Sequence, residues 1–474
     1  MKGDFSRDTF NPANHYTRVL MQQGRVQLDA DVNEQSAITD YYRRMLAADL
    51  IGPHGGPSAD LGFGISTDPT AVAALRDAYG RALDPAEVKR LQTALGRGDF
   101  LIGTGRYYVA GAMCQNDSPR LFSDQPGYPF DAATTLEALR AAGSFVIYLD
   151  AWERHVNTLE DPEIIEPALG GPDTATRAQL SWQVRLLMVD DGQIAPANLA
   201  EAVAPGMCAL QARATVPDTP TDACMVDPQS RYRGLENQLY RVEIHAPGLA
   251  GTPGGAPGAS FKWSRENGSV TLAILGAPVP DASSQTTTLT LASLGRDTDL
   301  GLVVGGWVEL VDDDATARHQ AGPLFRVHAI NPDDASVVLE GIVGVEATAD
   351  HFTRAYLRRW DQAGDAGSGT LAVAEAPVGQ DAWMELEDGV QIEFPAEFLP
   401  GQPNQYRTGD YWLLPARTAT GKLDWPAGPD GPLPRPPLGE WHAYAPLALG
   451  AATKDGILEF TQPDLRKRFG PLAT

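Results

Sequence analysis

The stretch Phe145-Val-Ile-Tyr-Leu-Asp-Ala-Trp152 is the most apolar run of this 474-residue chain. Aromatic and β-branched side chains dominate it, and a short continuous run of that kind is typical of a strand buried on both faces. The later stretch 181–188 alternates polar and apolar residues over most of its length, which indicates a strand with one face in water. The sequence therefore predicts a β-sheet organised around residues 145–152.

Short strands continue along the chain. Residues 240–245 alternate in the same way, and short apolar runs recur regularly between residues 286 and 343, which is typical of a small barrel or sandwich. Residues 100–103 and 106–109 are bounded by glycine and predict a hairpin. A second hairpin is expected for residues 260–274, because Asn267-Gly268 is a strong turn signal.

Helices are predicted only near the N-terminus. Asp31 stands three residues before Glu34, as in a capping box, and Gly52-Pro53 would end a helix over 31–50. Apolar residues at helical spacing over 69–95 predict two further helices, separated at Asp84-Pro85. The expected fold class is mainly β with a few helices near the N-terminus and several small β-sandwich or barrel-like units in one chain.

The chain divides into five predicted regions, as expected for a length that exceeds one hydrophobic core. They are an N-terminal arm and helix (1–60), a helical insertion (61–98), a β-rich central domain with a long loop over 160–176 (99–275), a small β-barrel or sandwich (276–350), and a C-terminal β-rich region with a proline-rich segment over 426–439 (351–474).

Charge and composition limit the kinds of partner that this chain is expected to bind. A net charge of −24 argues against nucleic acid and anionic membranes, because phosphate groups would be repelled. No stretch is apolar enough to cross a membrane, and the first ten residues lack the apolar core of a secretory signal, so we expect cytoplasmic synthesis without a signal peptide. Three cysteines cannot form a disulfide framework; buried thiols are expected, with a Cys208–Cys224 bridge as the alternative.

Two groups of residues could carry chemistry. Glu153 and His155 would share one face of a strand, as an acid and a base could, and the run 312–314 with His319 could offer ligands to a divalent cation. Neither group has an identifiable partner elsewhere, and pairing of the loop charges with Arg154 and Arg177 explains the first group equally well. The sequence therefore predicts no catalytic residues, no metal site and no cofactor.

Two other polar groups are predicted to be structural. Asp173 and Arg177 are expected to hold the loop over 160–176, because an ordered glycine-rich loop must satisfy its polar groups locally. Arg233, Glu236 and Asn237 cluster before the strand over 240–245 and are expected to form a second polar network.

Several motifs of the chain resemble those of an uncharacterised bacterial domain family whose members are often encoded beside contractile-tail genes. The motifs are Lys2-Gly-Asp-Phe-Ser-Arg7, Arg233-Gly-Leu-Glu-Asn-Gln-Leu-Tyr-Arg-Val-Glu-Ile-His245 and Phe261-Lys-Trp-Ser-Arg-Glu-Asn267. The resemblance runs nearly from end to end, with residues 69–95 as a departure. It supplies no catalytic residues to carry over.

The resemblance implies a structural or adaptor component of a phage-tail-like contractile injection particle, associated with its baseplate, spike or fibre, and not an enzyme. Its partners would be other protein subunits of the particle, with homo-oligomerisation left open, and the particle could be released from the cell. The extended N-terminal segment would suit docking, with these candidate contacts: Lys2, Asp4, Phe5, Arg7, Phe10 and Tyr16. Packing of this segment on its own chain is the alternative.

Two other functions remain open. A carbohydrate-binding or carbohydrate-cleaving module of the tail-spike kind could stack sugars on Trp152, Trp182, Trp263, Trp360 or Trp412. A cargo effector carried by the particle is the other alternative.

Overall fold

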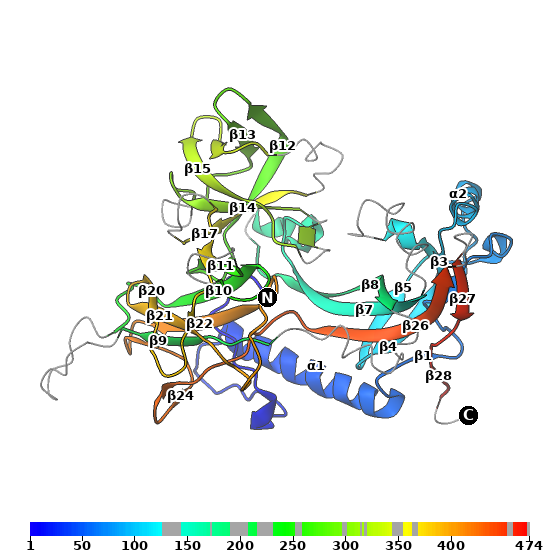
Figure 1. Ribbon diagram of the computed structural model, residues 1–474, viewed down its shortest axis with the longest axis horizontal. Helices are drawn as coiled ribbons and strands as arrows, with labels where there is room; N and C mark the ends of the chain where they lie inside the picture. The colour runs from blue at the N-terminus through cyan, green and yellow to red at the C-terminus, as the bar shows by residue number, and fades with distance from the viewer. Residues whose placement is uncertain are drawn as a thin grey trace, which may run out of the picture.

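The structure, a computed structural model, describes residues 1–125, 144–170, 173–189, 207–215, 231–251, 258–295, 301–312, 315–316, 320–343, 354–362, 368–452 and 458–471. In these residues the chain is mainly β with two α-helices, and its strands form several small sheets and one closed barrel. The predicted fold class is therefore confirmed. Figure 1 shows the barrel above a body of sheets, with the helix α1 running beneath that body.

The apolar run 145–152 lies in the middle of a four-stranded antiparallel sheet. Its strand, β7 (Ser144–Val156), pairs along its whole length with β8 (Arg177–Val189) on one side. On the other side it pairs with β26 (His442–Ala452), which in turn pairs with β27 (Leu458–Gln462). Residues 145–152 are all buried, as the continuous apolar run predicts.

Two small sheets, built from the first 125 residues and one C-terminal strand, pack near this central sheet and share its hydrophobic core. One contains β1 (His54–Pro57), β4 (Gly105–Val109), β5 (Ala112–Asn116) and β28 (Arg468–Phe469); the other contains β2 (Ile65–Ser66), β3 (Leu101–Ile102) and β6 (Arg120–Leu121). The hairpin predicted for residues 100–109 is wrong, because β3 and β4 belong to different sheets. The chain turns between them at Gly105 (φ +120°), where its backbone crosses Gly62 so closely that a Cβ on Gly62 would lie 2.4 Å from the Gly105 carbonyl carbon.

The segment over 69–95 contains one α-helix, α2 (Pro85–Leu95), and not two. The Asp84 side chain accepts from the Ala86 amide and Pro85 occupies the first turn, as the sequence predicts. The first predicted helix is reduced to a short 3₁₀ turn. The carboxylate of Asp77 accepts the amides of Tyr79 and Arg81, and these local bonds favour a turn over a helix.

A two-layer β-sandwich forms the second unit. One layer contains β10 (Gln238–Ala246), β11 (Ser260–Ser264), β18 (Leu371–Ala372), β22 (Tyr411–Arg417) and β23 (Lys422–Leu423); the other contains β9 (Gln211–Ala214), β19 (Glu375–Ala376), β20 (Met384–Glu387) and β21 (Val390–Pro395). Side chains of both layers meet in one core, in which the rings of Phe261 and Phe394 lie 5.3 Å apart.

The third unit is a closed six-stranded barrel with its own hydrophobic core. Its strands are β12 (Thr271–Asp281), β13 (Thr286–Leu291), β14 (Trp307–Val311), β15 (Leu324–Asn331), β16 (Ser336–Glu340) and β17 (Tyr356–Trp360). The hairpin predicted for residues 260–274 is wrong, because β11 belongs to the sandwich and β12 to the barrel. Asn267 and Gly268 do adopt positive φ angles, as an Asn-Gly turn should, but they carry the chain between the two units.

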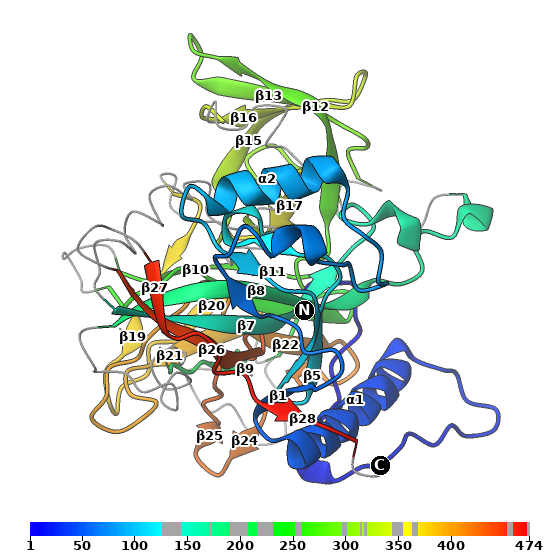
Figure 2. The same cartoon turned by 90° about the vertical axis from the view of Figure 1, so that its right-hand side faces the viewer.

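The long helix α1 (Asp29–Ile51) lies below the sheets in both Figure 1 and Figure 2. It ends at Gly52, which has φ +91° and donates its amide to Ala48, as Gly52-Pro53 predicts. The proline-rich segment 426–439 contains the short pair β24 (Ala427–Gly428) and β25 (Gly431–Pro432). Short 3₁₀ turns complete the described structure: Pro12–Asn14, Val72–Ala74, Phe122–Asp124, Pro162–Ile164 and Pro167–Leu169.

Candidate docking surface

The first residues of the chain run into its interior. The N-terminus lies at the centre of the molecule in Figure 1, where the sandwich, the barrel and the end of β7 meet. The Lys2 ammonium lies 2.9 Å from the Glu243 carboxylate on β10. The Asn267 side-chain amide donates to the carbonyls of Met1 (3.2 Å) and Gly3 (2.9 Å). Residues 1–3 are therefore bound to the body of the protein and do not form a free arm.

A buried ion cluster surrounds Lys2. Its other members lie on sandwich and barrel strands: Arg241, Glu243, Lys262, Glu309 and Arg358. Glu243 accepts from Arg241 at 2.6 Å, and Lys262 lies 2.7 Å from Glu309. Burial alone would raise the pKa of Glu243, but Lys2, Arg241 and Lys262 together hold it well below its usual range.

His155, at the end of β7, lies beside this cluster, and the Phe5 ring stands nearly perpendicular to its imidazole, with the two ring centroids 6.1 Å apart. Burial, helped by Arg358, lowers the pKa of His155 from 6.5 to about 3. Burial likewise lowers the pKa of His54 and of His245 to about 4. All three histidines are therefore held neutral in the folded protein.

These histidines predict a loss of stability in acid. Each takes up a proton near pH 6.5 when the chain unfolds but stays neutral in the fold, so the free energy of unfolding should decrease as pH falls below about 6.5, by up to about 1.4 kcal/mol per pH unit per histidine. His155→Phe keeps the ring and removes one titrating group. Urea unfolding between pH 7 and 5 should therefore give a shallower pH slope for this variant than for the wild type. Equal slopes for the wild type and His155→Phe would contradict the buried, neutral state.

Beyond Phe5, the chain leaves the interior and folds along α1. The Ser6 amide donates to Asp29 at 2.8 Å, and the Thr9 hydroxyl donates to Glu34 at 2.6 Å. The segment then returns, and the Val19 amide donates to the Gln35 side chain at 2.8 Å. Residues 6–19 are thus tied to the helix by polar bonds.

The apolar side chains of this region point into solvent. Ten of the 25 exposed large apolar side chains in the described part of the chain lie between residues 16 and 50. Four of them, at the i, i+3, i+4 and i+8 positions of α1, define what we call the α1 stripe: Tyr42 (43% exposed), Met45 (44%), Leu46 (61%) and Leu50 (60%). The other six are Tyr16, Leu20, Met21, Val26, Leu28 and Val32.

The six docking residues predicted from the sequence separate into two groups. Lys2, Phe5 and Phe10 contact their own chain, the last through the ring of Tyr41 at 5.8 Å. The other three are exposed: Asp4, Arg7 and Tyr16. For residues 1–10 the alternative of packing on the same chain therefore describes the structure. The exposed apolar side chains between residues 16 and 50 are therefore the better candidates for docking.

Asp173 and Arg177 are not brought together. Both are exposed, and Arg177 donates only to the adjacent Thr176 carbonyl, so the described part of the loop shows no ion pair between them. The loop is instead anchored at its start by the buried Glu160, which accepts the Asn157 amide and pairs with Arg154 at 3.3 Å. The Glu160 carboxylate thus anchors the loop in place of the interactions expected of Asp173 and Arg177.

Arg233, Glu236 and Asn237 do not form one network either. Arg233 pairs with Glu385 at 2.8 Å, and Asn237 accepts the Thr418 amide at 3.0 Å. Glu236 contributes its backbone carbonyl, which accepts from the Tyr232 hydroxyl. Each residue therefore ties a different neighbouring segment.

The candidate acid and base near β7 do not converge on a site. Glu153 pairs with Arg44 of α1 at 3.1 Å, while His155 faces the N-terminal segment. Of the acidic run with His319, only Asp312 lies within the described residues, and its carboxylate accepts the Ala315 amide. Among the described residues no three His, Cys, Asp or Glu side chains are grouped as metal ligands would be. Cys208 is buried, and Cys224 lies outside the described residues.

Most tryptophans proposed to stack on sugars are buried. Four are at most 3% exposed: Trp152, Trp263, Trp360 and Trp412. Trp182 is partly buried and donates its indole N–H to the Gln115 carbonyl.

No described helix is both long and apolar enough to span a membrane.

The exposure of the α1 stripe was not expected from the sequence, because apolar residues at helical spacing usually mark the side of a helix that faces the core. On α1 only Ala30 and Ile38 are buried. The helix thus contains more apolar residues than one buried face requires, and this excess is the feature of the sequence that could have indicated an exposed apolar surface.

Comparison with known proteins gives a match to a family model but none to an individual protein. No curated protein and no solved structure gives a significant match to the chain. A model of a family of unknown function, DUF6519, matches residues 1–204 and 194–458, and so covers nearly the whole sequence. The chain belongs to this uncharacterised family.

Proposed function

We propose that the chain is a structural adaptor of a phage-tail-like contractile injection particle, associated with its baseplate, spike or fibre, and not an enzyme. The observation that carries the adaptor role is the exposed apolar surface of α1 and residues 16–28. Soluble proteins that act alone rarely expose large contiguous apolar patches, and such patches commonly mark protein interfaces. The assignment to a tail-like particle rests on the sequence resemblance.

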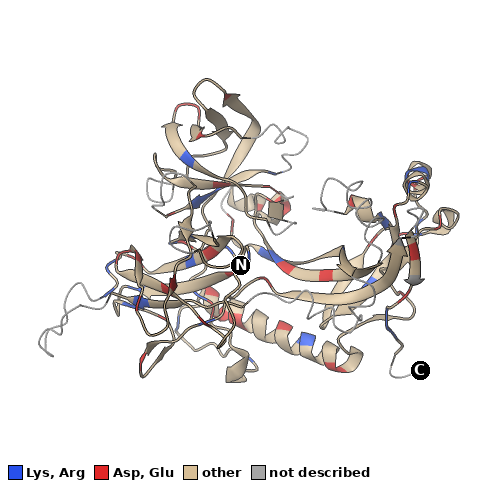
Figure 3. Cartoon of the chain, in the orientation of Figure 1, with Lys and Arg blue, Asp and Glu red and all other residues tan. Residues whose placement is uncertain are grey.

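The partner would be another protein subunit with an apolar groove. The α1 stripe places its four side chains at the spacing with which an amphipathic helix fits such a groove. The chain carries a net charge of −24, and several of its acidic residues lie along α1 (Figure 3), so a basic rim on the partner would be attracted to it over long range and would speed association.

Two features support a role without catalysis. The buried carboxylates Glu243 and Glu309 are each paired with cations, and Glu160 is engaged in holding its loop, so none of the three is available to transfer protons. Burial raises the pKa of Cys114 to about 12, which leaves this thiol protonated and weakly nucleophilic at neutral pH. Protein that assembles on the particle surface in fixed stoichiometry would favour the adaptor over a cargo effector.

Leu46→Glu tests the docking surface. A carboxylate in the centre of an apolar interface should weaken incorporation into the tail-like particles of the producing cells by about tenfold or more, as loss of an interface hot spot does. Incorporation is measured as the ratio of this chain to the tail-tube subunit in purified particles. Thermal stability should stay unchanged, because Leu46 is 61% exposed.

Leu235→Glu is the matched control, since Leu235 is 98% exposed and lies outside residues 16–50. It should be incorporated like the wild type. Normal incorporation of Leu46→Glu would refute docking through α1, and absence of the wild-type chain from purified particles would refute the particle assignment itself.

A further inference from the structure

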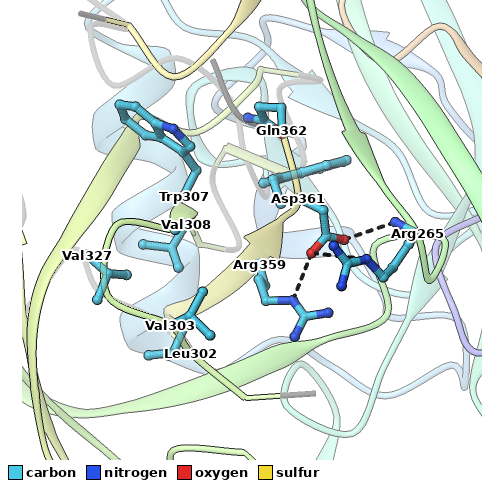
Figure 4. A pocket seen from close by; sticks show the side chains of 11 residues that line it. Arg265, Leu302, Val303, Trp307, Val308, Val327, Arg359, Asp361 and Gln362 are labelled. Carbon is cyan, nitrogen blue, oxygen red and sulfur yellow. Dashed lines mark hydrogen bonds and ion pairs between the residues drawn. The ribbon is translucent and has the colours of Figure 1, made fainter. Parts of the chain in front are cut away.

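A pocket of about 250 Å³ lies where the barrel meets the sandwich. Its walls come from the barrel strands β14, β15 and β17, from the segment that leads into β14, and from Arg265, directly after β11. Figure 4 shows that charged side chains line one side of this pocket and aliphatic side chains the other. The pocket is separate from α1, which lies below the sheets in Figure 1 and is not among the elements that line the pocket.

The charged wall is a chain of ion pairs. Arg265 pairs with Glu387 at 2.8 Å. Arg359 lies 3.2 Å from Asp361 and 2.6 Å from Glu266. Of the three carboxylates only Asp361 lines the pocket, while Glu266 and Glu387 pair with the two guanidinium groups from outside the lining and so offset much of their positive charge. The charged wall presents fixed hydrogen-bond donors and acceptors side by side.

The opposite wall is aliphatic and partly open. It consists of Leu302, Val303, Val308 and Val327, with Trp307 beside them. Val303 is 47% exposed, so the pocket opens to solvent on this side, whereas Trp307 is only 7% exposed and forms part of the packed lining. A ligand bound here would place one face against aliphatic C–H groups, and the side of the ligand next to Val303 would remain open to solvent.

We propose that this pocket binds one neutral sugar ring, as the terminal unit of a glycan. A hydroxyl group both donates and accepts hydrogen bonds, so a row of ring hydroxyls matches the alternating guanidinium and carboxylate groups of Arg265, Asp361 and Arg359. The C–H face of the same ring fits the aliphatic wall. The volume is below the roughly 300–1,000 Å³ typical of pockets for drug-sized ligands, which suits a single ring.

The structure thus assigns sugar binding to a different place from the one that the tryptophan content suggested. Of the five tryptophans proposed from the sequence, only Trp360 borders this pocket, and Trp307 was not among them. The inference is independent of the adaptor role, because it concerns the isolated protein and residues far from α1 in the fold.

Saturation-transfer NMR of the purified full-length protein tests this proposal, with glucose, galactose, mannose, rhamnose and N-acetylglucosamine as probes. At least one sugar should receive saturation on its ring C–H protons. Val303→Trp should fill the pocket and weaken that binding by about tenfold or more. Val304→Trp is the matched control, since Val304 is 65% exposed and does not line the pocket, and it should bind like the wild type.

Three results would overturn the proposal. The first is the absence of saturation transfer to every sugar of the panel. The second is undiminished binding by a Val303→Trp protein whose thermal melt matches the wild type. The third is displacement of the bound sugar by acetate or phosphate at equal concentration, which would assign the pocket to anions.

Discussion

Replacing Glu243 with glutamine is expected to lower the free energy of unfolding by about 3–5 kcal/mol, the usual cost of removing one partner from a buried ion pair. Glu243 is 3% exposed and faces three cations, namely Lys2, Arg241 and Lys262. Without its charge, Arg241 and Lys262 stay buried and Lys2 half-buried, with Glu309 as the only other carboxylate of the cluster. Urea unfolding at pH 7 measures the effect.

The matched control is Glu385→Gln, which removes an ion pair with Arg233 whose partners are both more than a third exposed. Its expected cost is below about 1 kcal/mol. Because the pKa of Glu243 is held below its usual range, the stability it contributes is present above about pH 4.3 and is lost as pH falls further. The difference between the wild type and Glu243→Gln should therefore shrink below pH 4. A loss at pH 7 no larger than the control's would mean that water reaches the cluster.

Deleting residues 2–5 is expected to be about as costly, on the order of 3 kcal/mol, because it removes a partly buried cation of the ion cluster together with the hydrogen-bonded backbone that holds it. Lys2 leaves Glu243, and the Gly3 carbonyl leaves Asn267. The ring of Phe5 also leaves His155, which opens a gap at the end of β7. Thermal and urea unfolding of the deletion protein measure the loss.

Residues 12–15 provide the control for this deletion, since all four are exposed. Their replacement by an equal length of glycine and serine should change stability by less than about 1 kcal/mol. If the deletion protein instead unfolds like the wild type, residues 2–5 do not stabilise the body, and the docking role first expected for them regains its basis.

The buried ion cluster explains why this part of the molecule could not be predicted. Residues 240–245 alternate polar and apolar, which the sequence rules assign to a strand with one wet face. In the structure the polar face of β10, with Arg241 and Glu243, is covered by residues 1–3 and by the barrel. Alternation in a sequence predicts that the two faces of a strand differ in polarity. It does not predict whether water or buried counter-ions satisfy the polar face.

Local signals worked where local interactions decide the structure. The strand at 145–152, the end of α1 at Gly52 and the start of α2 at Asp84-Pro85 all follow from residues close in sequence. Both predicted hairpins failed because distant contacts decide the pairing. Asn267, for example, forms its turn but uses its side chain to hold Met1 and Gly3.

The pairing of β7 with β26 constrains how the chain can fold as it is synthesised. The barrel strands all lie between residues 271 and 360, so the barrel can close as soon as that segment has left the ribosome. The apolar strand β7 emerges much earlier, but its partner β26 begins only at residue 442. During that interval one edge of the most apolar strand of the chain stays unpaired, and an unpaired apolar edge favours aggregation until β26 has been synthesised.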